Sequence, residues 1–408
     1  MTLPTPDRDS TPPTPTQRTA RVSASVGFGL QGFFLAVLLT QLPQFKDKYG
    51  FDDTTIALVV VMASVIAGGG SVLAEYVATR TSSKTTLRAG LAVIAAAGLG
   101  IALSPGTVPF FVGFAVYGIG LGMVDAATNM QAVAIQRCYG RSILSSFHAV
   151  WSVGAITGAL FVSLCEALDV SLLVSIALAS LVVAGATAAL GPRLLVTGSE
   201  AEAELEASST PLVIPWRPFL ALGTAMALFF AIDFSVGNWS ALYLKDLLLS
   251  SSSTAALAVA AYQGAGLISR FTGDHWVRRH GEIAVVRVGA TIAALGLVVV
   301  VFAHSPAVAI VGFLVVGLGA PVIAPLCFSA AGRLAPPEQT DAVIARLNLF
   351  NYAGTIIGGG VVGGIAAMTD LRVGFAVPLV FAVALIFLAP AFHPNRATTE
   401  PSQPDRVG

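Results

Sequence analysis

Long apolar stretches, separated by short polar segments, recur from one end of the chain to the other. A helix needs about 20 apolar residues to cross a hydrocarbon layer of roughly 30 Å, because each residue adds about 1.5 Å of length. Twelve stretches satisfy this requirement. They lie near residues 22–42, 55–78, 87–103, 108–136, 144–165, 170–190, 217–243, 254–272, 284–303, 306–331, 342–368 and 373–392. The pattern predicts an all-α integral membrane protein with twelve transmembrane helices.

The positive charges predict how these helices are oriented, because cytoplasmic segments of membrane proteins retain Lys and Arg. With a cytoplasmic N-terminus, all but four of the 22 Lys and Arg residues fall on the cytoplasmic side. The exceptions are Lys46, Lys48, Lys245 and Arg372. We therefore expect a multi-pass protein of the cytoplasmic (inner) membrane with both termini cytoplasmic. The polar segments are expected to form a disordered cytoplasmic tail at 1–21, a cytoplasmic linker at 191–216 and a second cytoplasmic tail at 393–408.

The two halves of the chain repeat a pattern of charges and glycines at an offset of 199 or 200 residues. The aligned pairs include Glu75 with Asp274, Arg80 with Arg279, Gly154 with Gly354 and Gly158 with Gly358. Two copies of a six-helix unit in the same orientation are typical of transporters whose halves move around a central site. The repeat predicts six-helix bundles at 22–190 and 217–392, related by pseudo-two-fold symmetry.

Glycines and prolines mark places where the predicted helices pack closely or bend. Small residues four positions apart, such as Gly154 and Gly158, let helix backbones approach each other. Such pairs suit moving helices, and they suit a static bundle equally well. Pro321 and Pro325 remove backbone donors within the stretch 306–331, so a kink is expected there.

Composition agrees with a membrane protein and excludes several other classes. The chain is 55% hydrophobic and 11% charged, with a mean hydropathy of +0.81. This is too little polar surface for a soluble globule. The net charge is zero and no basic tract indicates a nucleic-acid partner. Cys138, Cys165 and Cys327 lack metal-ligand spacing, and SSKTT at 82–86 lacks the glycines of a phosphate loop. We expect no metal, no cofactor and no ATP-driven step.

The segment GLISRFTGDHWVRRHG, residues 266–281, resembles the cytoplasmic loop signature of the major facilitator superfamily, Gly-x-x-x-Arg-x-x-Gly-Asp followed by basic residues. The segment FHAVWSVGAITG, residues 147–158, contains His-x-x-Trp-Ser-x-Gly and is similar to a branch of bacterial inner-membrane permeases in that family. In that branch the helix at 217–243 usually reads Glu-Gly-x-x-x-Asp-Trp-Ser, where this chain has Asp233, Phe234 and Asn238. The resemblance covers nearly the whole chain and implies the major facilitator fold.

The resemblance also implies a charged gate at the cytoplasmic ends of the helices. Its members are Glu75 with Arg346, Asp274 with the start of the helix at 144–165, and Arg270 of the loop signature. In transporters of this family such contacts break and re-form during cycling. For Arg346, reaching out to the lipid headgroups is the alternative interpretation.

Two carboxylates, Asp125 and Asp233, lie well inside the predicted spans. A charge in mid-membrane costs about 2.5–3.5 kcal/mol on insertion scales, so each is expected to face a cavity or a partner. Desolvation favours the neutral form of a carboxylate. Either aspartate is therefore a candidate for binding a proton on one side of the membrane and releasing it on the other. A structural hydrogen bond or a fixed ion pair is the alternative for both.

A histidine, His148, stands in an apolar run, about as far after a predicted helix turn as Asn129 stands before it. Asp125 and Asn129 share one helix face, and His148 and Trp151 share another. We expect these four residues to form a cluster in which His148 relays protons or binds substrate. A neutral histidine that joins two helices is the alternative. The further residues expected to line the substrate cavity are Gln31, Asn238, Gln263, Asn348, Asn351 and Tyr352.

These features predict a secondary active transporter, not an enzyme, that moves a small organic solute by alternating access, coupled to protons. It is expected to work as a monomer among membrane lipids. A transporter-like sensor without a transport cycle and a membrane-embedded enzyme are the alternatives. Neutral sugars and amphipathic compounds are both open as substrates. The spans at 22–42, 108–136, 217–243 and 306–331 have no central Lys or Arg, which argues against a dedicated anion carrier.

Overall fold

The computed structural model describes residues 12–196 and 214–393, nearly all of them helical. The expected linker and tails lie largely outside the described residues. The first half contains α1 (Pro15–Thr40), α2 (Leu42–Tyr49), α3 (Asp53–Arg80), α4 (Ser83–Leu103), α5 (Thr107–Tyr139), α6 (Leu144–Ala167), α7 (Leu172–Leu190) and η1 (Gly191–Arg193). The second half contains α8 (Trp216–Leu242), η2 (Tyr243–Leu247), α9 (Ser252–His280), α10 (Glu282–Val301), α11 (Pro306–Gly319), η3 (Ala320–Val322), α12 (Ile323–Ala331), η4 (Pro337–Gln339), α13 (Thr340–Met368), α14 (Leu371–Leu388) and η5 (Ala389–Phe392).

Eleven helical segments within residues 12–196 and 214–393 are long and apolar enough to cross a membrane. The twelfth predicted span is α9, which has 29 residues and is long enough. Its hydropathy is lowered by Arg270, Asp274 and the basic residues of its last turn. The prediction of an all-α membrane protein with twelve spans is confirmed.

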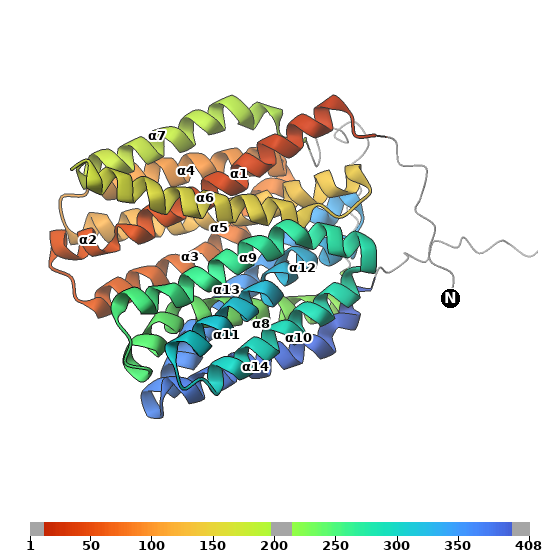
Figure 1. Cartoon of the computed structure of the whole chain (residues 1–408). Coiled ribbons are helices and arrows are strands. Elements are labelled where there is room, and N and C mark those ends of the chain that lie inside the picture. Colours follow the sequence, from red (N-terminus) through yellow and green to blue (C-terminus); the bar gives the residue numbers. More distant parts are fainter. Residues whose placement is uncertain (1–11, 197–213, 394–408) are drawn as a thin grey trace, which may run out of the picture.

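The helices form two bundles, with α1–α7 in the upper part of Figure 1 and α8–α14 in the lower part. Equivalent helices of the two bundles make equivalent contacts. Helix α1 packs on α6 as α8 packs on α13, and α3 packs on α5 as α9 packs on α11. The bundles meet through α3 against α13 and α6 against α9, again a symmetric pair. This arrangement confirms the pseudo-two-fold symmetry that the sequence repeat predicts.

Successive spans alternate in direction (Figure 1), so the start of α1 and the ends of α3 and α5 lie at one end of the molecule. We call this the inner end, after its expected cytoplasmic orientation. The opposite end, which holds α2 and the end of α4, is called the outer end. Lys46 and Lys48 belong to α2 and therefore lie at the outer end, as the charge pattern predicts.

Glycines allow the closest contacts between paired helices. A Cβ atom at Gly154 of α6 would lie 2.0 Å from the carbonyl oxygen of Gly29 in α1. A Cβ atom at Gly354 of α13 would lie 2.3 Å from the carbonyl oxygen of Ala227 in α8. One turn further along each helix, a Cβ atom at Gly158 or Gly358 would lie 2.3 Å from a facing carbonyl oxygen. The close packing predicted from the glycine pattern is confirmed.

Proline determines where two of the spans break. The span predicted at 306–331 consists of α11, η3 and α12, because Pro321 and Pro325 interrupt its backbone hydrogen bonds. The first span breaks at Gln41, which was not predicted. The ring of Pro43 excludes a regular helix around the carbonyl of Leu39, four residues earlier. Helix α2 therefore starts anew beyond the break.

The first helix also begins earlier than the predicted span at 22–42. Thr14 and Gln17 form a capping box, in which each side chain accepts the backbone N–H of the other residue. Pro15 at the first helical position supports this start. Part of the segment expected to be a disordered tail is thus helical, because its capping residues were not recognised.

Candidate functional site

Asp125 lies on α5, between the two halves, and accepts hydrogen bonds from four side chains. Gln31 Nε2 of α1 donates to Oδ1 at 3.0 Å. Three groups of α13, in the second half, donate to Oδ2. They are Asn348 Nδ2 at 3.0 Å, Asn351 Nδ2 at 2.9 Å and the Tyr352 hydroxyl at 3.0 Å. The structure brings one of the two predicted coupling residues together with four predicted cavity residues.

Two amide oxygens beside Asp125 have no hydrogen-bond partner among the described residues. They are Oε1 of Gln31 and Oδ1 of Asn348, both buried. The Nδ2 group of Asn348 donates to Ser71 Oγ at 2.9 Å as well as to Asp125. A buried acceptor without a partner costs about 1–3 kcal/mol, so these two atoms favour a bound molecule that carries hydroxyl or amide donors.

Asn129 connects Asp125 to His148. Its Nδ2 donates to the backbone carbonyl of Asp125 at 2.9 Å, and its Oδ1 lies 3.2 Å from His148 Nε2. Because Asn129 offers an oxygen at this position, we assign the hydrogen to Nε2 of His148. The imidazole also packs against Phe28 of α1 and Phe328 of α12. His148 joins α5 and α6 and touches the second half as well.

Four other predicted site residues make no hydrogen bond with Asp125. Asp233 on α8 is partly buried and accepts a hydrogen bond from the Tyr262 hydroxyl of α9 at 2.5 Å, within the second half. Asn238 and Gln263 are exposed. Trp151 is partly buried, and its backbone carbonyl faces α1. The predicted set therefore does not form a single hydrogen-bonded cluster.

Two charged contacts hold the halves together near the inner end. Arg346 of α13 donates to both carboxylate oxygens of Glu75 on α3, with distances of 2.7–3.2 Å. Asp274 on α9 accepts the backbone N–H groups of Ser145 at 3.0 Å and Ser146 at 2.8 Å. These groups belong to the N-terminus of α6, where a negative charge is stabilised. Both contacts have the expected partners, and their role as a gate stays a prediction.

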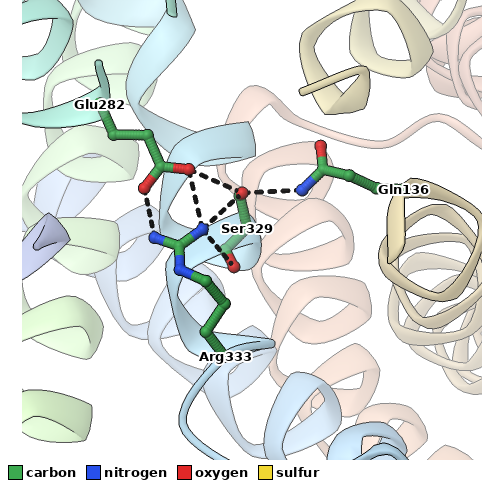
Figure 2. Close-up of polar contacts among 4 residues, drawn as sticks. All are labelled: Gln136, Glu282, Ser329 and Arg333. Atoms are coloured by element: carbon green, nitrogen blue, oxygen red, sulfur yellow. Dashed lines mark hydrogen bonds and ion pairs between the residues drawn. The ribbon is translucent and has the colours of Figure 1, made fainter. Parts of the chain in front are cut away.

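A third contact between the halves, shown in Figure 2, was missed in the sequence. Gln136 of α5 donates to Ser329 Oγ of α12 at 2.8 Å, and this hydroxyl donates to Glu282 of α10 at 2.9 Å. Glu282 also forms an ion pair with Arg333. The Oε1 atom of Gln136 accepts the backbone N–H of Ile143 at 2.9 Å, just before α6. No spacing rule pairs Glu282 with Arg333, which are 51 residues apart.

Arg270 lies deeper in the molecule than the other predicted gate residues. It belongs to α9, is 7% exposed and donates through Nη1 to Ser152 Oγ of α6 at 2.8 Å. Its Nη1 lies 3.8 Å from the position that a Cβ of Gly266 would occupy, so the side chain extends along α9 away from the inner end. The guanidinium is therefore directed towards the middle of the molecule.

A groove of about 430 Å³ lies between α9 and α10, away from the polar cluster. Its lining is mainly apolar, and Ile268, Trp276 and Val288 within it are 56%, 50% and 58% exposed. Large exposed apolar side chains on a membrane-spanning helix are expected where the helix faces lipid. We assign this groove to the lipid-facing surface.

The fold and the inter-bundle cluster define a membrane transporter with two six-helix halves. The sequence profile of the Major Facilitator Superfamily matches residues 3–159 and 221–408, and the chain belongs to this family. An uncharacterized MFS-type transporter of Yersinia pestis is 30% identical over 388 residues, which cover 93% of this chain and 96% of that protein. The predicted family is confirmed. Membership of the permease branch with the His-x-x-Trp-Ser-x-Gly motif stays a prediction.

Solved structures show the same fold at low sequence identity. The transporter FucP in its outward conformation has a TM-score of 0.75 and 16% identity, with 93% of this chain and 99% of that chain covered. The transporter XylE, bound to 6-bromo-6-deoxy-D-glucose, has a TM-score of 0.70 and 12% identity, with 91% and 94% covered. These similarities establish the architecture of the two halves.

Proposed function

We propose that this protein is a secondary active transporter that carries a small organic solute across the cytoplasmic membrane by alternating access, with Asp125 coupling transport to protons. The observation that carries the proposal is that Asp125 accepts hydrogen bonds from α1 of its own half and from α13 of the other half. FucP of Escherichia coli is described as a fucose:proton symporter and XylE as a proton:xylose symporter. These descriptions make a proton-driven cycle the first one to test.

The contacts between the halves support a conformation that is closed at the inner end. Glu75 with Arg346, Asp274 with the start of α6, and Gln136 with Ser329 all join the halves there. Opening this end requires these contacts to break as the halves rotate. In a bundle built from two repeats, such rotation exposes a central site to one side of the membrane at a time.

Protonation of Asp125 is expected to loosen the contact between α5 and α13. Three donors of α13 converge on its Oδ2 atom, so the carboxylate acts only as an acceptor. A proton on either oxygen adds a donor that competes with these groups for space. Hydrogen bonds to a charged group contribute about 1.5–3 kcal/mol each, so weakening them shifts the balance between two conformations appreciably. A proton bound at Asp125 would thus favour separation of the halves.

Asp233 is the second candidate for coupling, and its surroundings support it less. Its hydrogen bond to Tyr262 joins two helices of the same half. The protonation state of Asp233 therefore has no direct effect on a contact that changes when the halves move. The proposed substrate contacts are the unpaired oxygens of Gln31 and Asn348, together with His148.

The test is transport in proteoliposomes with an imposed pH gradient, using a panel of radiolabelled sugars, polyols and organic acids. Wild-type protein should accumulate at least one solute against its gradient. Asp125→Asn should abolish this accumulation and retain exchange of labelled for unlabelled solute, because exchange needs no net proton movement. Asp233→Asn is the matched control and should retain accumulation. Unchanged accumulation by Asp125→Asn would contradict the coupling role, and a wild type that moves no solute would contradict transport itself.

A further inference from the structure

Arg270 is a buried cation without an anionic partner. It is 7% exposed, and its Nε atom is buried with no hydrogen-bond partner. Within residues 12–196 and 214–393, its side chain donates to the Ser152 hydroxyl at 2.8 Å and forms no ion pair with a carboxylate. A hydroxyl does not neutralise a guanidinium, and burial of an unpaired charge is costly.

The carboxylates on neighbouring turns and helices are already engaged. Asp274, one turn further along α9, accepts two backbone N–H groups of α6 and the hydroxyl of Ser142. Asp233 accepts the hydroxyl of Tyr262. Neither carboxylate forms an ion pair with Arg270 among the described residues, and Asp233, like Asp125, has only neutral side-chain donors.

The position of the guanidinium relates it to the proposed site. Arg270 extends along α9 towards Gly266 and contacts α6 of the other half through Ser152. Its charge acts on His148, which is hydrogen-bonded through Asn129 to the backbone of Asp125. Arg270 thus lies between α6 and α9, where its charge acts both on His148 and on Tyr262, the donor to Asp233.

We propose that Arg270 binds the carboxylate of the transported solute, and that the substrates are small hydroxylated monocarboxylates. Guanidinium and carboxylate form paired, charge-assisted hydrogen bonds, and the unpaired Nε supplies a donor for them. The unpaired oxygens of Gln31 and Asn348 would accept hydroxyl groups of the same solute. The single positive charge of Arg270 matches the single negative charge of a monocarboxylate. It matches a phosphate ester less well, because such an ester carries about 1.5–2 negative charges at neutral pH.

This inference rests on the proposed function and differs from the expectation that the chain is not a dedicated anion carrier. The spans at 22–42, 108–136, 217–243 and 306–331 have no central Lys or Arg, and the signature motif assigned Arg270 to the gate. The structure instead places its charged group one turn deeper than Asp274, between α6 and α9.

The first test requires no ligand. If Arg270 is unpaired because it binds an anionic solute, its charge destabilises the protein when no solute is bound. In detergent and a buffer free of organic acids, Arg270→Gln should then unfold at the same temperature as wild-type protein or at a higher one. The control is Arg333→Gln, which breaks the ion pair with Glu282 and should unfold at a lower temperature. A loss of thermal stability in Arg270→Gln that equals the loss in Arg333→Gln would show a structural role and overturn the inference.

The second test measures binding by thermal stabilisation with matched pairs of solutes, lactate against 1,2-propanediol and gluconate against sorbitol. Wild-type protein should prefer at least one acid to its alcohol. Arg270→Gln should lose this preference by about tenfold or more, and Arg270→Lys should retain part of it. Arg287→Gln, an exposed arginine of α10, is the control and should keep the preference. The inference is wrong if wild type shows no preference or if Arg270→Gln keeps it. Acid binding without any transport would contradict the proposed function alone.

Discussion

Asp125 has only neutral partners, and this choice of partners suits a group that exchanges protons. Its four side-chain donors are three amides and a phenol. An arginine or lysine in the same place would hold the carboxylate in its ionised form throughout the cycle. Under the proposed mechanism, amide and hydroxyl donors stabilise the charged form in this conformation and are expected to release it when the halves part. Glu75, in contrast, has a cationic partner, since Arg346 donates to both of its carboxylate oxygens near the inner end.

A substitution at Gly154 tests the closest contact between helices of one half. In Gly154→Ala the new Cβ would lie 2.0 Å from the carbonyl oxygen of Gly29, so α6 must move away from α1. Overpacking of this kind costs about 1–3 kcal/mol. The thermal unfolding midpoint in detergent should fall. The control is Gly185→Ala in α7, where no atom lies within 4 Å and the midpoint should stay or rise, because alanine favours a helix by about 1 kcal/mol.

Equal midpoints for the two glycine variants would show that α1 and α6 separate without a stability cost.

The sequence allowed the close contact at Gly154 to be predicted, because the spacing of Gly154 and Gly158 is a property of one helix. It did not show that Asn348 and Asp125 meet, since that pair depends on how α13 of one half packs against α5 of the other. The same limit explains why Asp233 and Asp125 were grouped together.

Helices α11 and α12 show how proline positions divide a span into two elements. Pro321 lies in η3, and its ring is 3.2 Å from the position that a Cβ of Gly266 would occupy. Pro378 lies inside α14, which continues without a break from Leu371 to Leu388. The break between α11 and α12 therefore depends on the local sequence, in which Pro321 is followed by Pro325. The proline pattern predicted this break, whereas the break before α2 was not predicted, because Pro43 lies just beyond the predicted span at 22–42.

Pro321→Ala is expected to restore hydrogen bonds between α11 and α12 and to stiffen this span. The rate of solute uptake in proteoliposomes should fall. The thermal unfolding midpoint should stay unchanged or rise, because alanine stabilises a helix relative to proline. Pro378→Ala is the control, and its uptake rate should match that of the wild type. If both variants keep the wild-type rate, the break has no part in transport and serves only to fit the span against α9.

At the scale of the whole molecule, the contacts near the inner end form a system with the symmetry of the fold. Helix α3 ends beside the start of α13, and α9 ends beside the start of α6. The family resemblance implied both pairings, and the repeat aligns Glu75 with Asp274. The contact of Gln136 with Ser329 has no equivalent in the repeat pattern and was found only in the structure. Rigid halves would make these separate contacts open together.

Labelling of a buried cysteine can measure this joint opening. Ser145 is buried on α6 and packs against Gly273 of α9. It therefore belongs to the pair α6–α9, whereas Glu75 belongs to the pair α3–α13. In a Cys138→Ser background, Ser145→Cys should react slowly with a maleimide, and adding Glu75→Gln should raise the rate. The Glu75–Arg346 pair is partly exposed, with side-chain exposures of 21% and 44%, so its contribution is small. A pair of this kind contributes about 0.5–1 kcal/mol, which corresponds to a rate increase of about twofold to fivefold.

The matched control for this labelling is Glu166→Gln, which removes a carboxylate bonded to Gln44 within the first half. It should leave the reaction of Ser145→Cys unchanged, because that contact does not join the halves. An equal increase in both variants would indicate general loosening of the protein. No increase with Glu75→Gln would mean that α3 and α13 separate independently of α6 and α9, and the halves would then not move as rigid bodies. The expected pattern, an effect of Glu75→Gln alone, follows from a single rotation that opens every contact of the inner end.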